Sequence, residues 1–375
     1  MAKTRLVLAS VLKPVNDTRM FEKFAVSLSQ SNKYDINIIG FSVKKTPRHS
    51  NIHTIPLYSF HRLSLKRLLA PVQYGLKLLQ VKPKIIIINT PEILAVSIAY
   101  KILFGAKLVY DVQENYYRNI ACNDLYPTLL KWPLAVAIRL KEHFCSPLIN
   151  HFILAERCYV QELSFINEPK NRHTVLENKY VPLLPAPKEV NQPVKGKLLQ
   201  FVLTGTLAKG YGTLDAIRFI DQMHAIYPNC RLHIIGYSAN ADFYQQILKY
   251  IAGKSYIQLT GGNQLVPHKA IIEAIKQAHF GLVCYHPNKS TENCLPTKLF
   301  EYMYNKLPVL LVKNPLWQSF CAQYKAAYPI SFNTFNPENT LNALFSTTFY
   351  TSNTSPNQLL WANEATKLLQ VLNSL

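Results

Sequence analysis

The sequence predicts an α/β protein with two doubly wound parallel sheets. Three observations support this prediction. The chain has 375 residues, which is too long for one ordinary hydrophobic core. Short apolar runs alternate with longer amphipathic segments, and this alternation occurs in two successive series. A stretch rich in proline separates the series. Strands that alternate with helices are typical of parallel sheets with covered faces, so each series predicts one Rossmann-like domain.

The first series contains five short apolar runs that we interpret as strands. The tract KIIIIN at 84–89 is apolar on both faces, as expected for a parallel strand that is buried on both sides. The expected strands are 5–10, 34–41, 84–89, 107–112 and 151–155. The expected helices are 17–31, capped near Asn16 or Asp17, 63–81 with a break at Pro71, 91–105 ending at Gly105, and 125–145.

The second series repeats the pattern and ends in an amphipathic helix. Its expected strands are 198–205, 231–236, 256–261, 280–285 and 309–312. Its expected helices are 211–227, 240–252, 267–279, 297–305 and 358–375. We therefore expect a first domain at 1–180, a linker at 181–197, a second domain at 198–355 and a C-terminal helix at 356–375. Ligands of such sheets bind beyond the carboxyl ends of the strands, and the cleft between two domains is the default site.

The charge of the chain predicts an anionic partner. There are 41 Lys and Arg residues against 21 Asp and Glu, a formal net charge of +20, and the excess is concentrated in residues 1–110. Nucleic acid, a membrane surface and phosphorylated ligands are the classes that such a charge favours. The basic, aromatic stretch 58–84 predicts docking on an anionic membrane. The alternative is an ordinary helix with a basic, solvated side.

Cysteine usage and hydropathy predict the compartment. The seven cysteines include no Cys-x-x-Cys pair, which indicates reduced thiols in the cytosol. The most apolar tract, 85–104, is interrupted by polar residues and falls short of the roughly 20 apolar residues of a spanning helix. We expect a soluble protein, or one bound at a membrane surface.

Two strand-end loops of the first series carry polar residues that could bind a substrate. The first loop lacks the Gly-x-Gly-x-x-Gly fingerprint, which weighs against NAD or FAD, but it offers Asn16, Asp17 and Arg19 at a helix start. The alternative there is a helix cap with a solvated arginine. The second loop follows strand 107–112 and could hydrogen-bond a polyhydroxylated substrate, with tyrosines as walls. The alternative is a structural loop. Its polar residues are Asp111, Gln113, Glu114, Tyr116 and Arg118.

Two loops of the second series have features of a phosphate site. In TGTLAKGYG (204–212) the glycines would let the backbone approach a ligand, and the following helix start favours an anion, although turn glycines are the alternative. In the second loop, a helix start at 297 is accompanied by Lys298, which adds a mobile positive charge. Glu301 could accept two hydrogen bonds from the hydroxyls of a ribose. Its alternative role is to complement the helix dipole from the first turn. The histidines and cysteines show neither metal-ligand spacing nor a Ser-His-Asp arrangement.

Four segments together resemble one family. PVNDTRMFEKFAVSL, LVYDVQENYY, TGTLAKGYGTLDAI and CLPTKLFEYMYNKLPVLL occur in the order and spacing of retaining GT-B glycosyltransferases of the family 4 type. The resemblance implies two Rossmann-like domains facing a cleft, with the last helix packing back on the first domain. It also implies a nucleoside-diphosphate sugar held mainly by the second domain, an acceptor held by the first, and no metal or cofactor.

The resemblance assigns roles residue by residue. Glu301 matches the glutamate that contacts the donor ribose, and Gly205 matches the glycine turn near the diphosphate. Asn293 stands where the family often has another glutamate, and Gln113 where many members have a sugar-contacting histidine. The donor-binding residues implied are Gly205, Thr206, Tyr211, Asn293, Leu295, Thr297 and Glu301. The acceptor-binding residues implied are Asn16, Asp17, Arg19, Glu114 and Arg118.

The sequence departs from the family at the diphosphate. Thr206 and Tyr211 occupy the positions of the two basic residues that neutralise it. Because the leaving group develops negative charge in the transition state, Lys209 and Lys298 are expected to substitute, with Gln113 orienting the sugar. Replacing both lysines with alanine should lower turnover at least tenfold, about 1.4 kcal/mol of barrier.

The resemblance predicts transfer of a sugar, with retention, to a glycan or lipid-linked acceptor in bacterial surface polysaccharide synthesis. The protein would be cytoplasmic and peripheral on the inner face of the membrane. Three alternatives stay open: a sugar-nucleotide epimerase or hydrolase, a degenerate transferase that only binds partners, and a nucleic-acid-binding protein, for which no reader motif is present.

Overall fold

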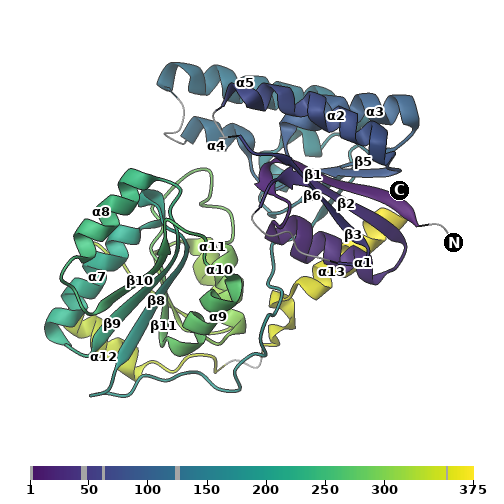
Figure 1. The fold of residues 1–375 in the computed structure, drawn as a ribbon. Helices are drawn as coiled ribbons and strands as arrows, with labels where there is room; N and C mark the ends of the chain where they lie inside the picture. The colour runs from purple at the N-terminus through teal and green to yellow at the C-terminus, as the bar shows by residue number, and fades with distance from the viewer. Residues whose placement is uncertain (1–2, 44–48, 61–63, 123–126, 352–353) are drawn as a thin grey trace. The chain divides into compact units, whose positions relative to one another are not determined.

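The chain folds into two α/β units (Figure 1). The computed structural model describes residues 3–43, 49–60, 64–122, 127–351 and 354–375. Unit 1 comprises Met1–Val181 together with Trp361–Leu375, and unit 2 comprises Pro182–Leu360.

Unit 1 is built on a sheet of seven strands that all run parallel. Their order across the sheet is β3-β2-β1-β4-β5-β6-β7. The strands are β1 (Thr4–Pro14), β2 (Tyr34–Phe41), β3 (Ile52–Tyr58), β4 (Ile85–Ile88), β5 (Lys107–Val112), β6 (His151–Leu154) and β7 (His173–Val175). All four isoleucines of β4 are buried, which fits a central strand covered on both faces.

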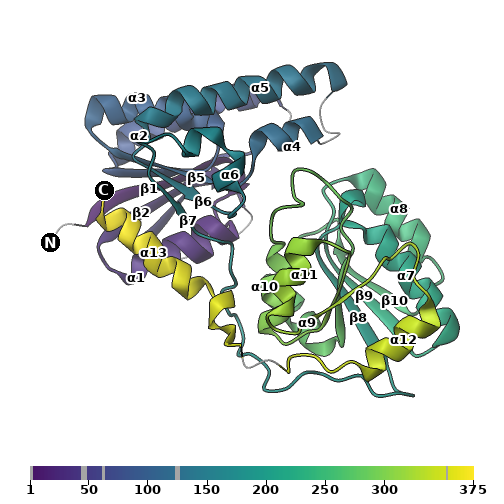
Figure 2. The ribbon, with the colours of Figure 1, turned by 180° about the vertical axis from the view of Figure 1, so that it is seen from behind.

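Helices cover both faces of this sheet (Figures 1 and 2). One face carries α2 (Ala70–Val81), α3 (Leu94–Phe104) and α5 (Thr128–Cys145), and the other carries α1 (Val26–Gln30) and α13 (Trp361–Asn373). The remaining helical segments of the unit are η1 (Thr18–Ala25), η2 (Leu65–Leu69), η3 (Pro91–Ile93), α4 (Tyr116–Cys122), η4 (Ser146–Leu148), α6 (Tyr159–Glu162) and η5 (Ser164–Ile166).

The C-terminal helix α13 is part of the hydrophobic core of unit 1. The Trp361 ring stacks on Phe24 with 5.6 Å between ring centroids. Its indole Nε1 donates a hydrogen bond to Ser27 Oγ at 2.9 Å, so both the apolar and the polar part of the side chain are satisfied. Leu368 and Leu372 are buried in the same cluster as the strand residues of β1 and β2.

Unit 2 is built on a second all-parallel sheet, of six strands in the order β10-β9-β8-β11-β12-β13. The strands are β8 (Leu199–Thr206), β9 (Cys230–Tyr237), β10 (Ile257–Gly262), β11 (Phe280–Val283), β12 (Val309–Leu311) and β13 (Ala327–Pro329). One face carries α7 (Thr213–Ile226), α8 (Ala241–Ile251) and α12 (Pro337–Ser346), and the other carries α9 (His268–Gln277), α10 (Thr297–Tyr304) and α11 (Pro315–Ala322). Two short 3-10 turns complete the unit, η6 (Lys209–Tyr211) and η7 (Pro356–Leu359).

The predicted fold class is confirmed, and the differences are local. Strands β3, β7 and β13 and helices α4, α6, α11 and α12 were not predicted, and α4 contains Tyr116 and Arg118, which were expected in a loop. The β13 run is only three residues long, and β3 contains Pro56, which weakens a strand pattern. The break expected at Pro71 is a change from the 3-10 turn η2 into α2, with proline in the first turn of α2, where its missing N–H costs nothing. Residue 63 of the predicted helix 63–81 and residues 125–126 of the helix 125–145 lie outside the described residues.

Candidate functional site

The candidate site of unit 2 lies at the carboxyl end of β8, where two loops are fixed to each other through their backbones. Gly212 has φ +69°, and a Cβ atom there would lie 1.9 Å from the carbonyl oxygen of Cys284. The loop after β11 is held to the same place because the His286 N–H donates to the Gly210 carbonyl at 2.9 Å. Only glycine fits position 212, so this part of TGTLAKGYG is built for close backbone approach.

Lys298 places a buried positive charge beside this loop. Its side chain extends from the first turn of α10, and Nζ donates a hydrogen bond to the Thr204 carbonyl at 2.6 Å. The nearby turn residue Gly205 has φ +93°, and a Cβ on it would lie 3.9 Å from Lys298 Nζ. Lys298 Nζ also lies 5.1 Å from the centroid of the Tyr285 ring, a cation–π contact. The expectation that Lys298 is mobile is wrong, because the residue is only 7% exposed.

Among the described residues, no carboxylate forms an ion pair with the ammonium of Lys298. Burial lowers the pKa of Lys298 to about 8, and the nearby Cys284 and Glu301 shift it in the opposite direction. The first turn of α10 adds backbone N–H groups without a side-chain cap, since the residue before it is Pro296. A buried cation beside an uncapped helix start is an electrostatic environment that favours an anion.

Glu301 lies one turn further along α10 and is held by a histidine. Its Oε1 is 3.0 Å from Nε2 of His268, the first residue of α9. The alternative of a first-turn acid is wrong, because the first turn of α10 contains no acidic residue. The side chain of Glu301 is 20% exposed, so the carboxylate is held in place while part of it reaches solvent. His268 was not predicted as a site residue, and only the expectation that α9 and α10 share a face could have suggested it.

The other residues predicted for the donor surround Lys298 at different depths. Tyr211 packs on Tyr285 with 4.6 Å between ring centroids, and Tyr285 in turn contacts Lys298. Thr206 and Lys209 are exposed, at the end of β8 and in η6. The structure therefore brings Gly205, Tyr211 and Glu301 around Lys298, but shows no contact between Lys209 and that group within the described residues. Three predicted residues lie in or next to the loop before α10: the exposed Asn293, the half-buried Leu295 and the exposed Thr297.

In unit 1 one predicted acceptor residue, Arg19, forms a buried ion pair with Asp111. Arg19 is 3% exposed and donates from Nη2 to Asp111 Oδ1 at 2.7 Å and from Nε to Asp111 Oδ2 at 2.9 Å. Its Nη1 donates to the Leu176 carbonyl at 2.9 Å. The alternative of a solvated arginine is therefore wrong, whereas Asp17 does cap the helix by accepting from two backbone N–H groups. Gln113 joins the pair, since its Nε2 donates to Asp111 Oδ2 at 2.7 Å.

The remaining predicted residues of unit 1 have separate partners. Glu114 Oε1 lies 3.7 Å from Lys13 Nζ, and Arg118 donates to Glu162 at 2.6 Å. Asn16 is exposed in the loop before Asp17. Tyr116 is buried and donates to the Asn89 carbonyl, so its ring is part of the core and does not form an open wall.

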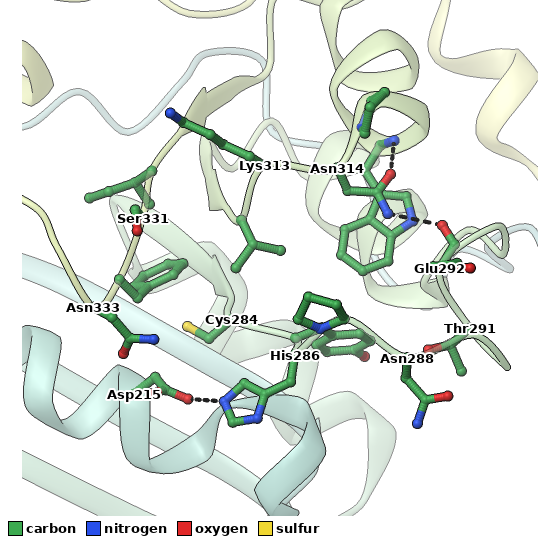
Figure 3. Close-up of a pocket in the computed structure, with 17 residues that line it drawn as sticks. Asp215, Cys284, His286, Asn288, Thr291, Glu292, Lys313, Asn314, Ser331 and Asn333 are labelled. Atoms are coloured by element: carbon green, nitrogen blue, oxygen red, sulfur yellow. Dashed lines mark hydrogen bonds and ion pairs between the residues drawn. The ribbon is translucent and has the colours of Figure 1, made fainter. Parts of the chain in front are cut away.

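A cavity of about 360 Å³ lies at the carboxyl ends of β11, β12 and β13 in unit 2 (Figure 3). Its polar lining includes Asp215 and His286, whose side chains are hydrogen-bonded, and Asp215 also binds Arg218. Trp317 and Phe332 supply apolar surface. The predicted site residues do not line this cavity, but Tyr285 does, so one ring contacts both the cavity and Lys298.

The described residues contain no group of three or more His, Cys, Asp or Glu arranged to hold a metal ion. None of their helices is long and apolar enough to cross a bilayer.

Comparison with known proteins shows the fold. No protein-family model matches the chain, and no curated protein sequence matches it. Solved structures do match along the whole length. Sucrose-phosphate synthase from Thermosynechococcus elongatus is similar over 99% of both chains, with a TM-score of 0.73 and 11% identity. The α,α-trehalose 6-phosphate synthase from Burkholderia multivorans covers 100% of this chain and 99% of its own, with a TM-score of 0.64 and 12% identity.

A third similar structure contains ligands. Anabaena HepE, solved in complex with UDP and glucose, is similar over 100% of both chains, with a TM-score of 0.65 and 11% identity. These likenesses define the class of the fold: the chain has the two-domain, Rossmann-like GT-B fold, as predicted.

Proposed function

We propose that this chain is a glycosyltransferase that uses a nucleoside-diphosphate sugar as donor. The observation that carries the proposal is Lys298 at the carboxyl edge of the unit 2 sheet, a buried ammonium that forms no ion pair with a carboxylate of the described residues. A diphosphate bound beside the Gly205 turn would supply the missing negative charge. The neighbours support the same ligand class, since HepE was solved with UDP and the trehalose-phosphate synthase from Burkholderia vietnamiensis is described as UDP-forming.

Residues near Lys298 would bind the rest of the donor. Glu301 has one oxygen at His268, so its orientation is fixed and the carboxylate can accept hydrogen bonds from ribose hydroxyls. Thr206, Tyr211, Asn293, Leu295 and Thr297 are proposed to complete the donor site, with Lys209 as a second, exposed cation.

The proposed reaction breaks the bond between the sugar C1 and the oxygen of the leaving phosphate and forms a bond from C1 to an acceptor hydroxyl. The acceptor proton moves to the departing diphosphate, which Lys298, Lys209 and the helix N-terminus stabilise electrostatically. We propose retention at C1 and no metal or cofactor, in agreement with the family resemblance of the sequence.

The acceptor side is proposed to lie in unit 1. Gln113 is proposed to orient the transferred sugar, and Asn16, Asp17, Arg19, Glu114 and Arg118 to support the acceptor. Since Arg19 and Gln113 are both bonded to Asp111, their role would be to fix the loop after β5. We propose a glycan or a lipid-linked acceptor in bacterial surface polysaccharide synthesis, at the cytoplasmic side of the membrane.

A screen of sugar nucleotides by thermal shift, followed by product analysis, tests the proposal. Binding of a nucleoside-diphosphate sugar, with transfer only when an acceptor is present, is the expected result. Release of free sugar at the same rate without any acceptor would favour a hydrolase, and formation of an isomeric sugar nucleotide an epimerase. A purified protein to which no sugar nucleotide binds would favour a non-catalytic binding protein.

A further inference from the structure

Helices α2, α3 and α5 form an outer layer on one face of the unit 1 sheet (Figures 1 and 2). The large hydrophobic side chains that unit 1 exposes, within its described residues, all lie on this layer and its flanking turns η2 and η4. We call this surface the outer face. It comprises Leu68, Leu69, Val72, Leu76, Leu79, Ile102, Leu103, Phe104, Leu129, Leu130, Trp132, Leu134, Val136, Leu140, Phe144 and Leu148.

The spacing along α2 shows that the exposed apolar residues form a second apolar side of the helix. Ala70, Tyr74 and Leu78 face the core and are buried. Leu76 and Leu79, which point away from them, are 58% and 48% exposed. A surface helix of a globular protein normally has one apolar stripe and a polar opposite side. Helix α2 therefore has two apolar sides, one buried and one exposed. The exposed side indicates that something other than water covers it.

Helix α5 shows the same feature at a regular spacing. Trp132, Val136, Leu140 and Phe144 follow one another at intervals of four residues, which places them along one side of the helix. They are between 44% and 73% exposed. Scattered exposed hydrophobic residues are normal, but a continuous set on three neighbouring helices marks an interaction surface.

The charges around the outer face are almost all positive. Segments 65–107 and 128–148 contain ten Lys and Arg residues but only Glu92 and Glu142 as acids. Glu92 pairs with Arg67, and Glu142 is buried. The described residues of these segments therefore present no carboxylate that is free to face outward, while Lys66, Lys84 and Lys107 are exposed.

This combination selects an anionic lipid surface as the occupant. Broad apolar surface rimmed by lysines, with Trp132 among the exposed residues, fits the interfacial region of a bilayer that carries negative headgroups. A second copy of the chain is a poorer fit, because a two-fold interface would oppose two positively charged surfaces.

We propose that the outer face docks unit 1 on the surface of an anionic bilayer, with α2, α3 and α5 lying against the headgroups. The inference deepens the proposed function and rests on it for the biological reason, since a lipid-linked acceptor would be met at such a surface. Docking itself requires neither donor nor acceptor, so it can be measured separately from transfer.

Co-sedimentation of the full chain with vesicles tests this inference. We expect binding to vesicles of phosphatidylcholine with a minority of phosphatidylglycerol, weaker binding to pure phosphatidylcholine, and further weakening as salt is raised. The triple variant Leu76→Gln, Leu103→Gln, Leu140→Gln should bind the anionic vesicles at least about tenfold more weakly. The variant Lys66→Gln, Lys84→Gln, Lys107→Gln should also bind the anionic vesicles more weakly, by at most about fivefold for each lysine near the surface.

Matched variants in unit 2 are the controls. Ile226→Gln, Leu265→Gln, Leu316→Gln removes the same kind of exposed side chain, and Lys195→Gln, Lys249→Gln, Lys269→Gln the same charge. Both should bind within about twofold of the wild type. Circular dichroism of each variant checks that it is folded. Absence of vesicle binding by the wild type, or equal losses in the controls, would overturn the inference. So would light scattering that shows a wild-type dimer converted to monomer by the first triple variant.

Discussion

The two units each bury a cation at the carboxyl edge of a parallel sheet, but they compensate it differently. In unit 1, Arg19 is bonded to both oxygens of Asp111 and to a backbone carbonyl. In unit 2, Lys298 is bonded to one carbonyl and lies near the Tyr285 ring. A buried charge is costly unless it is paired, so the compensated pair needs nothing further. The uncompensated lysine identifies the place where an anionic ligand would be stabilised.

The way in which the strand ends are held also differs between the units. Unit 1 uses side-chain charge, with Asp111 connecting Arg19 and Gln113. Unit 2 uses the close approach of backbones at Gly212 and Gly210. Backbone contacts leave N–H groups and a lysine available for a ligand. This difference fits the proposed roles, in which Arg19 and Gln113 act by fixing the loop after β5 and the unit 2 loops contact the donor directly.

The largest expected effect comes from breaking the ion pair of unit 1. Asp111→Asn leaves the Arg19 guanidinium buried without its counter-charge, and we expect a loss of about 3–5 kcal/mol in the free energy of unfolding. Urea titration followed by circular dichroism measures this loss. The exposed pair Lys269–Glu273, at 4.0 Å, is the control, and Glu273→Gln should change stability by less than about 1 kcal/mol. Equal effects of the two substitutions would show that Asp111 does not compensate a buried charge on Arg19.

A smaller loss is expected from the backbone contact of unit 2. Gly212→Ala places a methyl group against the Cys284 carbonyl at a residue with φ +69°, and should cost about 2–3 kcal/mol. Gly210→Ala is the matched control, because no atom lies within 4 Å of the added Cβ. Equal stability of the two variants in urea titration would contradict the close approach of Gly212 to the Cys284 carbonyl.

An effect of the opposite sign is expected for Lys298. Lys298→Met retains much of the side-chain volume and removes the buried charge, so at neutral pH the protein should gain about 1–2 kcal/mol of stability. Because the pKa of Lys298 is lowered to about 8, the unfolded chain binds one more proton than the native one between about pH 8 and the ordinary lysine pKa. Wild-type stability should therefore rise in that range relative to the methionine variant. Thermal unfolding of both proteins across this pH range measures the difference, and a variant less stable than wild type at neutral pH contradicts it.

The sequence predicted the fold because both series have strong periodicity. Both ends of strand 107–112 were predicted as the structure has them. The predicted site residues in the loops after the strands lie at the carboxyl edges of the two sheets. Burial and partner choice could not be predicted. Nothing local in VNDTRMF indicates that Arg19 reaches Asp111, 92 residues away, or that Lys298 reaches the Thr204 carbonyl. Such contacts depend on which strands are neighbours, and the β8–β11 pairing brings α10 to the Gly205 turn.

The binding of UDP as a function of pH, measured by isothermal titration calorimetry, tests most directly whether the Lys298 ammonium pairs with a diphosphate. If a diphosphate pairs with the Lys298 ammonium, wild-type affinity should fall as pH rises through about 8, where the lysine loses its charge. Lys298→Met should bind at least tenfold more weakly at neutral pH, about 1.4 kcal/mol, and show no such fall. Lys269→Met, which removes an exposed charge from the same unit, should resemble the wild type. Equal affinity and an equal pH dependence in the wild type and Lys298→Met would show that the Lys298 ammonium does not bind the diphosphate.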